Sequence, residues 1–157
     1  MILYHGSTID IAKVDLALSK PNKDFGRAFY LSDDRQQALE MAQFRAEFEE
    51  TEPVVNVYEF DEALFQEFRY KRFEAYTEEW AHFVYDHRTE PHGRTLHDYD
   101  IVYGPIANDR VGAQIARYKQ GYITFDEFLR RIQYIKGITF QYAFCTQRAI
   151  DKLQKIK

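Results

Sequence analysis

The order of the strand-like segments constrains the fold of this chain more than any other feature. Short apolar runs typical of β-strands lie near both ends, and others lie between them, at 2–4, 28–31, 54–60, 100–103 and 138–144. Helical patterns separate some of these runs but do not alternate regularly with them. A doubly wound parallel sheet is therefore not expected, and we predict one α+β domain over residues 1–157.

The composition agrees with a packed domain. Of the 157 residues, 45% are apolar and 17% are aromatic, so the chain has enough ring and aliphatic surface to bury a core. The segment 54–60 is rich in β-branched and aromatic residues and is the clearest strand. Loops are expected at 20–26, where Pro, Asn, Asp and Gly gather, and at 88–98.

Helix-capping residues predict where the helices begin. The residues 32–34 can cap a first helix, in which one side is expected to be buried because five residues recur at three- and four-residue spacing: Ala38, Met41, Ala42, Arg45 and Phe48. Further helices are expected after Asp61, Thr77, Asn108 or Asp109, Thr124 and Thr146.

Charge and cysteine content exclude several kinds of protein. The net charge of −4 gives no reason to expect a nucleic-acid backbone as a binding partner, although a nucleic acid can still be a chemical substrate. The single cysteine, Cys145, can form neither an internal disulfide nor a zinc cluster. Four of the five histidines lie between His82 and His97 without metal-ligand spacing, so no metal is expected.

The N-terminus, MILYHGS, has no basic region, no long apolar region and no cleavage site of a secretory signal. No stretch approaches the length of a membrane span. We therefore expect a cytoplasmic protein, or one that is delivered into a target cell, without a membrane partner.

Three segments place polar and aromatic groups at or within predicted strands. They are 4–7 (YHGS), 24–32 (DFGRAFYLS) and 140–144 (FQYAF). Each has an ordinary explanation as well, since glycines often make turns and tyrosines often pack in cores. Asp24-Phe25-Gly26 also occurs in kinases, but this sequence has neither the glycine-rich loop nor the catalytic loop of a kinase.

Together, these segments resemble the ADP-ribosyltransferase superfamily of the poly(ADP-ribose) polymerase and diphtheria-toxin type. The sequence looks closer still to a family of small bacterial domains of unknown function in that superfamily, in the segments YHGS, DFGRAFYLS, VNVYEF and DYDIVYGPIANDR. This resemblance covers nearly the whole chain. It implies an ADP-ribosyltransferase-like fold, with two small packed antiparallel sheets around an NAD-binding cleft and flanking helices.

The resemblance also implies roles for individual residues. His5 would bind a ribose hydroxyl of NAD⁺, the main chain of Gly6 would pair with the nicotinamide carboxamide, and the Tyr30 ring would stack on the nicotinamide. The remaining cofactor-binding residues would be Ser7, near the nicotinamide or its ribose, Gly26 in the DFG segment, and Arg27 at the pyrophosphate.

The late strand departs from the active pattern. A glutamate is expected there, and the sequence has Gln141, so the residues assigned to catalysis are Gln141, His5 and Tyr30. An amide forms hydrogen bonds but carries no net charge, and loss of one electrostatic element costs about a hundred- to a thousand-fold in rate. Four other carboxylates are candidates to take over this role: Asp100, Asp109, Glu78 and Glu79.

The leading expectation is an NAD⁺-dependent mono-ADP-ribosyltransferase, in the manner of a bacterial toxin or effector. Its acceptor would be a protein or a nucleic acid, and an antitoxin would be a natural partner. The alternative is a weak or inactive module that binds NAD⁺ or ADP-ribose, with Gln141 in place of the catalytic glutamate. A third alternative is a structural or interaction protein that keeps only the fold.

Overall fold

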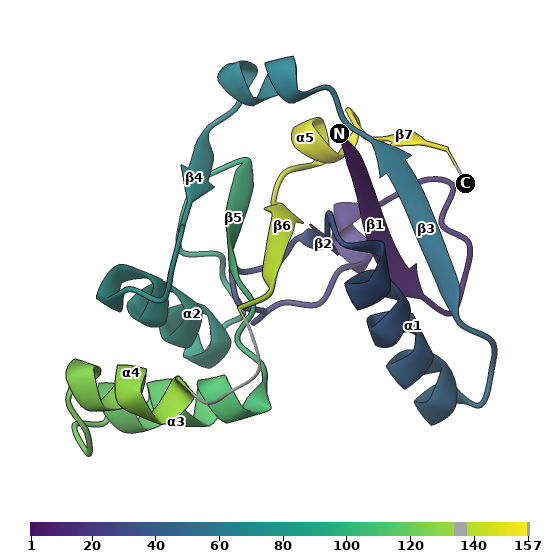
Figure 1. The fold of residues 1–157 in the computed structure, drawn as a ribbon. Coiled ribbons are helices and arrows are strands. Elements are labelled where there is room, and N and C mark those ends of the chain that lie inside the picture. The colour runs from purple at the N-terminus through teal and green to yellow at the C-terminus, as the bar shows by residue number, and fades with distance from the viewer. Residues whose placement is uncertain (134–137, 157) are drawn as a thin grey trace.

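A computed structural model describes residues 1–133 and 138–156 of the chain. It contains two small sheets, one with three strands in the order β1-β3-β7 and one with four strands in the order β2-β6-β5-β4 (Figure 1). The strands are β1 (Ile2–Ser7), β2 (Phe29–Leu31), β3 (Val54–Glu59), β4 (Tyr70–Arg72), β5 (Ile101–Pro105), β6 (Phe140–Phe144) and β7 (Gln154–Lys155). The α+β class is confirmed.

Five α-helices and two short 3₁₀ helices of the described residues surround the sheets. They are η1 (Leu16–Leu18), α1 (Arg35–Glu49), η2 (Glu62–Glu67), α2 (Glu78–Thr89), α3 (Asp109–Lys119), α4 (Phe125–Ile132) and α5 (Gln147–Ile150). The predicted caps are confirmed: the side chains of Asp34, Asp61, Thr77, Asn108, Thr124 and Thr146 each accept a hydrogen bond from an N–H in the first turn. None of the helices is long and apolar enough to cross a membrane within the described residues.

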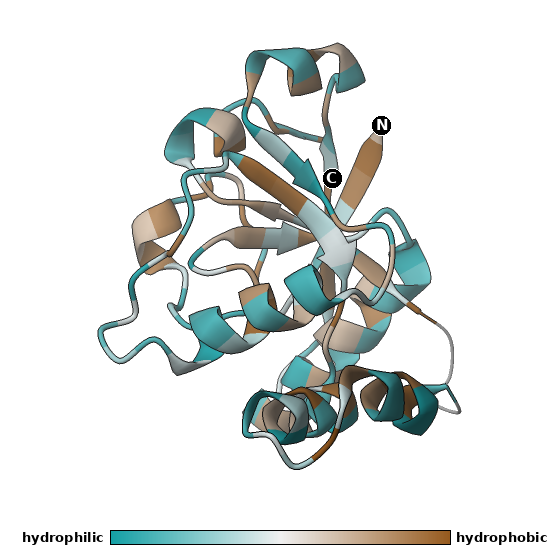
Figure 2. Ribbon diagram, turned by 90° about the vertical axis from the view of Figure 1, so that its left-hand side faces the viewer, coloured by the Kyte–Doolittle hydropathy of each residue, from teal (hydrophilic) through white to brown (hydrophobic). Residues whose placement is uncertain are grey.

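The core has two parts, one on each face of the four-stranded sheet. One cluster lies where the two sheets face each other and includes Leu3, Phe29 and Phe144. The other lies on the opposite face and packs the sheet against α2, α3 and α4, with Trp80 and Phe128 fully buried. Figure 2 shows that the helices mix hydrophobic and hydrophilic residues, as helices with one buried side do.

The expectation of two antiparallel sheets is met only by the three-stranded one. In the four-stranded sheet β4 runs parallel to β5, while the other pairs are antiparallel. The chain passes through α2 between β4 and β5, and a helical crossover brings the second strand back in the same direction as the first. The sequence did not predict β4 or β7, because the short segments Tyr70–Arg72 and Gln154–Lys155 lack the apolar, β-branched pattern of a strand.

The buried side of α1 agrees with the prediction only in part, at Ala38 and Ala42. The helix buries three alanines, Ala38, Ala42 and Ala46, whereas Met41 is 55% exposed and Phe48 is 86% exposed. The reason is the close approach of α1 to β1: a Cβ on Gly6 would lie 2.1 Å from the carbonyl oxygen of Ala38. Only small side chains fit under a helix that lies this near a strand.

Three predicted boundaries also change. The first strand does not end at Tyr4, because β1 continues through His5, Gly6 and Ser7 as the partner of β3. The expected loop at 88–98 begins only after Thr89, and its Glu90 is buried rather than exposed. The helix after Thr146 is a single turn followed by β7, and residue 157 lies outside the described residues.

Candidate functional site

The two sheets meet at one pair of residues between β1 and β2. The N–H of Tyr4 donates to the carbonyl of Ser32 at 2.7 Å, and the N–H of Ser32 donates to the carbonyl of Tyr4 at 2.8 Å. This is an isolated bridge, and within the described residues the two strands form no longer ladder. Among the described residues no further main-chain hydrogen bond joins β1 to β2, so the edge of β1 after Tyr4 has no strand paired with it there.

Gly6 lies on that edge. The main-chain groups of Val57 face β7, because the carbonyl of Val57 accepts a hydrogen bond from the N–H of Ile156. Tyr4 is opposite Val57 in the β1–β3 pairing, so the main-chain groups of Tyr4 face away from β3, toward Ser32. Main-chain groups alternate in direction along a strand, so the N–H and C=O of Gly6 point to the same side as those of Tyr4. The antiparallel order of the bridge places Tyr30 opposite Gly6.

His5 connects the two strands through a main-chain contact. Its Nδ1 lies 2.6 Å from the carbonyl oxygen of Tyr30, and its ring stacks on Phe29 with centroids 4.3 Å apart. Because a carbonyl only accepts, Nδ1 carries the proton and donates it. Burial lowers the pKa of His5, so the imidazole is neutral at pH 7 and its Nε2 offers a lone pair.

The Tyr30 ring faces away from His5. Phe29 belongs to the cluster between the sheets, while Tyr30 packs against the cluster on the opposite face. The Tyr30 hydroxyl donates to the carbonyl of Gly26 at 2.7 Å and accepts from the N–H of Phe25 at 2.9 Å. Burial raises the pKa of Tyr30 well above its ordinary value, so the phenol is protonated. The structure thus joins His5 to the main chain of Tyr30, not to its ring.

The other cofactor-binding candidates have different surroundings. Gly26 has a φ of 87°, and a Cβ there would lie 3.0 Å from the Thr95 side chain, so the position requires glycine. The Arg27 guanidinium donates to the main-chain carbonyl of Ser19 in the preceding loop. Ser7 is buried, and its hydroxyl accepts from the N–H two residues later at 3.4 Å. Gly26 supports Tyr30, while Arg27 and Ser7 face the loops that flank β1 and β2.

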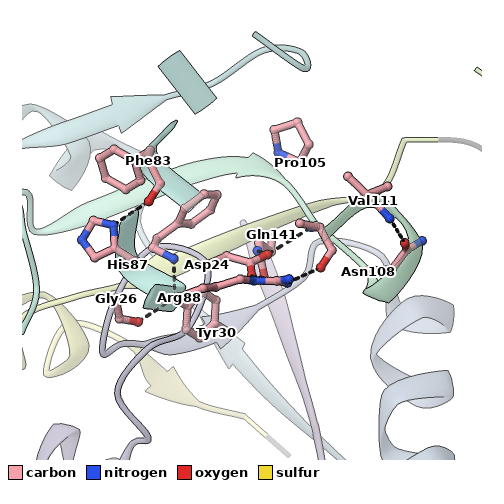
Figure 3. Close-up of polar contacts among 12 residues, drawn as sticks. Asp24, Gly26, Tyr30, Phe83, His87, Arg88, Pro105, Asn108, Val111 and Gln141 are labelled. Carbon is pink, nitrogen blue, oxygen red and sulfur yellow. Dashed lines mark hydrogen bonds and ion pairs between the residues drawn. The ribbon is translucent and has the colours of Figure 1, made fainter. Parts of the chain in front are cut away.

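Gln141 lies on the same face of the four-stranded sheet as Tyr30. Tyr30 is opposite Ala143 in the β2–β6 pairing, and Gln141 is two residues from Ala143 along β6. Its amide Nε2 donates to Oδ2 of Asp24 at 3.3 Å (Figure 3). The segment before β2 and the late strand β6, 117 residues apart in sequence, are thus joined by a side-chain hydrogen bond.

Asp24 is the centre of this polar cluster. Its carboxylate is 8% exposed and also accepts from the N–H of Ala107, at 3.0 Å. Arg88 on α2 binds the other carboxylate oxygen, through Nε at 2.8 Å and Nη2 at 2.6 Å, and also donates to the carbonyl of Ala107. The cluster therefore contains a paired, fully hydrogen-bonded carboxylate beside Gln141.

The four carboxylates expected as substitutes do not reach Gln141. Asp100 lies before β5 and binds the N–H of Arg69, the hydroxyl of Thr146 and the guanidinium of Arg148. Glu79 pairs with Lys71 at 2.9 Å, and Glu78 and Asp109 are exposed in the first turns of their helices. The carboxylate beside Gln141 is Asp24, which the sequence placed in the DFG segment without a role.

One family model matches residues 1–155 of the chain. The chain belongs to the DUF3990 family, described as proteins of unknown function. No curated protein and no solved structure matches it. For this DUF3990 domain, the site must therefore be judged by its own geometry.

Two residues that sequence reasoning missed complete the cluster of this DUF3990 domain. Arg88 was assigned to an exposed loop, although it sits on α2 and pairs with Asp24. A buried partner for Asp24 had no sequence signal, because the two residues are 64 apart. Asp24 lies in the predicted loop at 20–26, so its burial and its contact with Gln141 had no local signal either.

Two neutral histidines shape the segment that leads from α2 to β5. His87 donates from Nδ1 to the carbonyl of Phe83 at 2.7 Å, and its Nε2 accepts from the N–H of Leu96 at 2.9 Å. Burial lowers the pKa of both His87 and His97. No group of three or more metal-ligating side chains is found in residues 1–133 and 138–156.

An open hollow of about 870 Å³ lies away from this cluster, beside the N-terminus. It is lined by Met1, the segment 59–64 and three residues of the C-terminal segment, Asp151, Lys152 and Gln154. None of the predicted site residues lines it. The candidate site is therefore the edge of β1 together with the Asp24–Gln141 cluster, and not this hollow.

Proposed function

We propose that this protein is an NAD⁺-dependent mono-ADP-ribosyltransferase with an ADP-ribosyltransferase-like fold, of the kind that acts as a toxin or effector in the cytoplasm of a cell. The observation that supports this most is the open edge of β1. A main-chain donor and acceptor at one residue, Gly6, can pair with both halves of a carboxamide, the group that nicotinamide carries. That edge faces β2, the strand that carries Tyr30.

The residues around this edge fit the rest of such a ligand. The neutral His5 has a lone pair on Nε2 that can accept a hydrogen bond from a ribose hydroxyl. Tyr30 supplies the aromatic ring that the resemblance assigns to stacking on the nicotinamide, although this ring packs against the cluster on the face of the sheet opposite His5. Gln141 lies on the same face of the sheet as Tyr30, where its amide can bind a sugar hydroxyl.

NAD⁺ would supply the ribosyl group: the bond between ribose and nicotinamide breaks with its electron pair passing to the nicotinamide, and the acceptor forms the new bond and loses its proton. The chain's own part is to hold the carboxamide at Gly6, to keep the ribose in place with His5, and to stabilise the positive charge that develops on the ribose. The acceptor would be a protein or a nucleic acid, and an antitoxin would be a partner.

The experiment measures the release of nicotinamide from NAD⁺ and the transfer of labelled ADP-ribose to a cell lysate. We expect His5→Ala to weaken NAD⁺ binding about tenfold or more, because it removes a hydrogen bond from a buried group. His92→Ala is the matched control, since His92 is exposed. Binding that is absent in the wild type, or equal in the two variants, would contradict the proposal.

A second candidate function is an NAD⁺- or ADP-ribose-binding module without turnover. The observation that favours it is the uncharged Gln141 on β6, where the resemblance places a glutamate. Calorimetric binding of NAD⁺ without any release of nicotinamide would support the module and reject the transferase.

A further inference from the structure

The amide of Gln141 has a defined orientation. A carboxylate can only accept hydrogen bonds, so the NH₂ group of Gln141 must point to Asp24. The amide oxygen then points away from Asp24. None of the described residues donates a hydrogen bond to the amide oxygen of Gln141. Among the described residues, the buried side-chain atom without a partner is an oxygen of Gln37, so the unpartnered oxygen of Gln141 is not fully buried. The site therefore presents an acceptor.

The negative charge next to this amide is held by other contacts. Arg88 binds Oδ1 of Asp24, which leaves Oδ2 to Gln141 and to the N–H of Ala107. Asp24 is 8% exposed, so its interactions act in a poorly hydrated environment where they are strong. The carboxylate cannot rotate away from Gln141 without losing a main-chain hydrogen bond.

We propose that Asp24 and Gln141 act as one unit, in which the carboxylate of the site has moved from the late strand to the segment before β2. Asp24 is a positioning residue: it fixes and polarises the amide, whose free oxygen accepts a hydrogen bond from a ribose hydroxyl of NAD⁺. This inference rests on the proposed function. It explains why an amide, and not a second carboxylate, occupies β6.

The same geometry predicts how substitutions at the two positions combine. Gln141→Glu alone would bring two carboxylates together at the 3.3 Å separation of the present pair, and they would have to share a proton. Adding Asp24→Asn restores one carboxylate and one amide, with their positions exchanged. An asparagine at position 24 must turn its NH₂ group toward a donor, either Arg88 or the N–H of Ala107, so the double variant should recover only part of what each single variant loses.

The test compares four proteins: the wild type, Asp24→Asn, Gln141→Glu and the double variant. We expect kcat for nicotinamide release to fall about 100-fold or more in Asp24→Asn, with a much smaller change in KM. The double variant should exceed both single variants in kcat. Its thermal unfolding midpoint should also exceed that of Gln141→Glu, which is a readout independent of catalysis.

The results separate this inference from the proposed function. Wild-type turnover together with unchanged kcat in Asp24→Asn overturns the inference alone, as does a double variant no better than either single one. A wild-type protein that neither binds nor cleaves NAD⁺ overturns both. Glu52→Gln, at an exposed carboxylate between α1 and β3, controls for general loss of charge and should leave kcat unchanged.

Discussion

Asp24 and Asp100 are two buried aspartates next to the four-stranded sheet, with nearly the same kinds of partner. Each accepts hydrogen bonds from one arginine, one main-chain N–H and one polar side chain. Asp24 is 8% exposed and Asp100 is 6% exposed. Asp24 reaches the segment after β5, and Asp100 comes directly before β5. The two sites therefore lie at opposite ends of one strand.

The polar side chains that bind the two aspartates differ in their other hydrogen bonds. At Asp100, the polar side chain is Thr146, whose hydroxyl also caps α5, so that site ties helix, strand and loop together. At Asp24, the polar side chain is Gln141, whose amide oxygen has no donor among the described residues. The two carboxylates are buried to a similar extent but have different roles. Asp100 links a strand, a helix and a loop, whereas Asp24 orients the amide of Gln141, whose oxygen is available to a ligand.

The largest difference is expected when the arginine is removed. Arg88 is 33% exposed, and Arg88→Met leaves the carboxylate of Asp24 without its counter-charge, which should lower the free energy of unfolding by about 3 kcal/mol. Arg148 is 63% exposed, so Arg148→Met should cost about 1 kcal/mol or less. Urea unfolding at pH 7 measures both. Equal losses would show that the two ion pairs are equivalent.

A smaller effect is expected from Asp100→Asn. The change weakens three hydrogen bonds and should lower the free energy of unfolding by about 2 kcal/mol. Turnover of NAD⁺ per folded molecule should stay at the wild-type level, unlike in Asp24→Asn. Asp98→Asn is the control, because Asp98 is 79% exposed and should change stability very little. If Asp100→Asn abolished turnover, the distinction between the two aspartates would fail.

The smallest expected effect is on how the stability of the protein changes with pH when Asp100 is replaced. Burial alone would raise the pKa of Asp100, but the N–H of Arg69, the hydroxyl of Thr146 and Arg148 together hold it below its ordinary value. A lowered carboxyl pKa stabilises the fold above the unfolded value of about 4, and this contribution is lost as the pH falls through the folded pKa. Asp100→Asn should therefore lose less stability than the wild type between pH 4 and pH 2.

The histidines provide the internal reference for that measurement. Burial lowers the pKa of His5, His87 and His97, so their contribution is complete above about pH 6.5 and is lost as the pH falls below it. The loss of stability that begins below about pH 6.5 should be the same in the wild type and in Asp100→Asn. Thermal unfolding from pH 8 to pH 2 measures both, and a first loss that changed with Asp100 would contradict the assignment.

Much of the fold could be predicted because its signals are local. The side chain that begins each α-helix, such as Asp34 or Thr124, acts within three residues, and the β-branched run at 54–60 needs no distant partner to favour a strand. The buried side of α1 was predicted correctly at Ala38 and Ala42 and wrongly at Met41, Arg45 and Phe48. Hydrophobic spacing identified Met41 and Phe48, but the close approach to Gly6 selected alanines.

The α+β class and the positions of the helix starts could be inferred from the sequence, since these depend on neighbours along the chain. Which carboxylate lies beside Gln141 depends on the three-dimensional packing, because Asp24, Arg88 and Gln141 come from the segment before β2, from α2 and from β6. The hydrogen bonds of Asp24 to Arg88 and to Gln141 join residues that are 64 and 117 positions apart in the sequence. These contacts depend on how the sheets and helices pack, and a local sequence pattern cannot predict them.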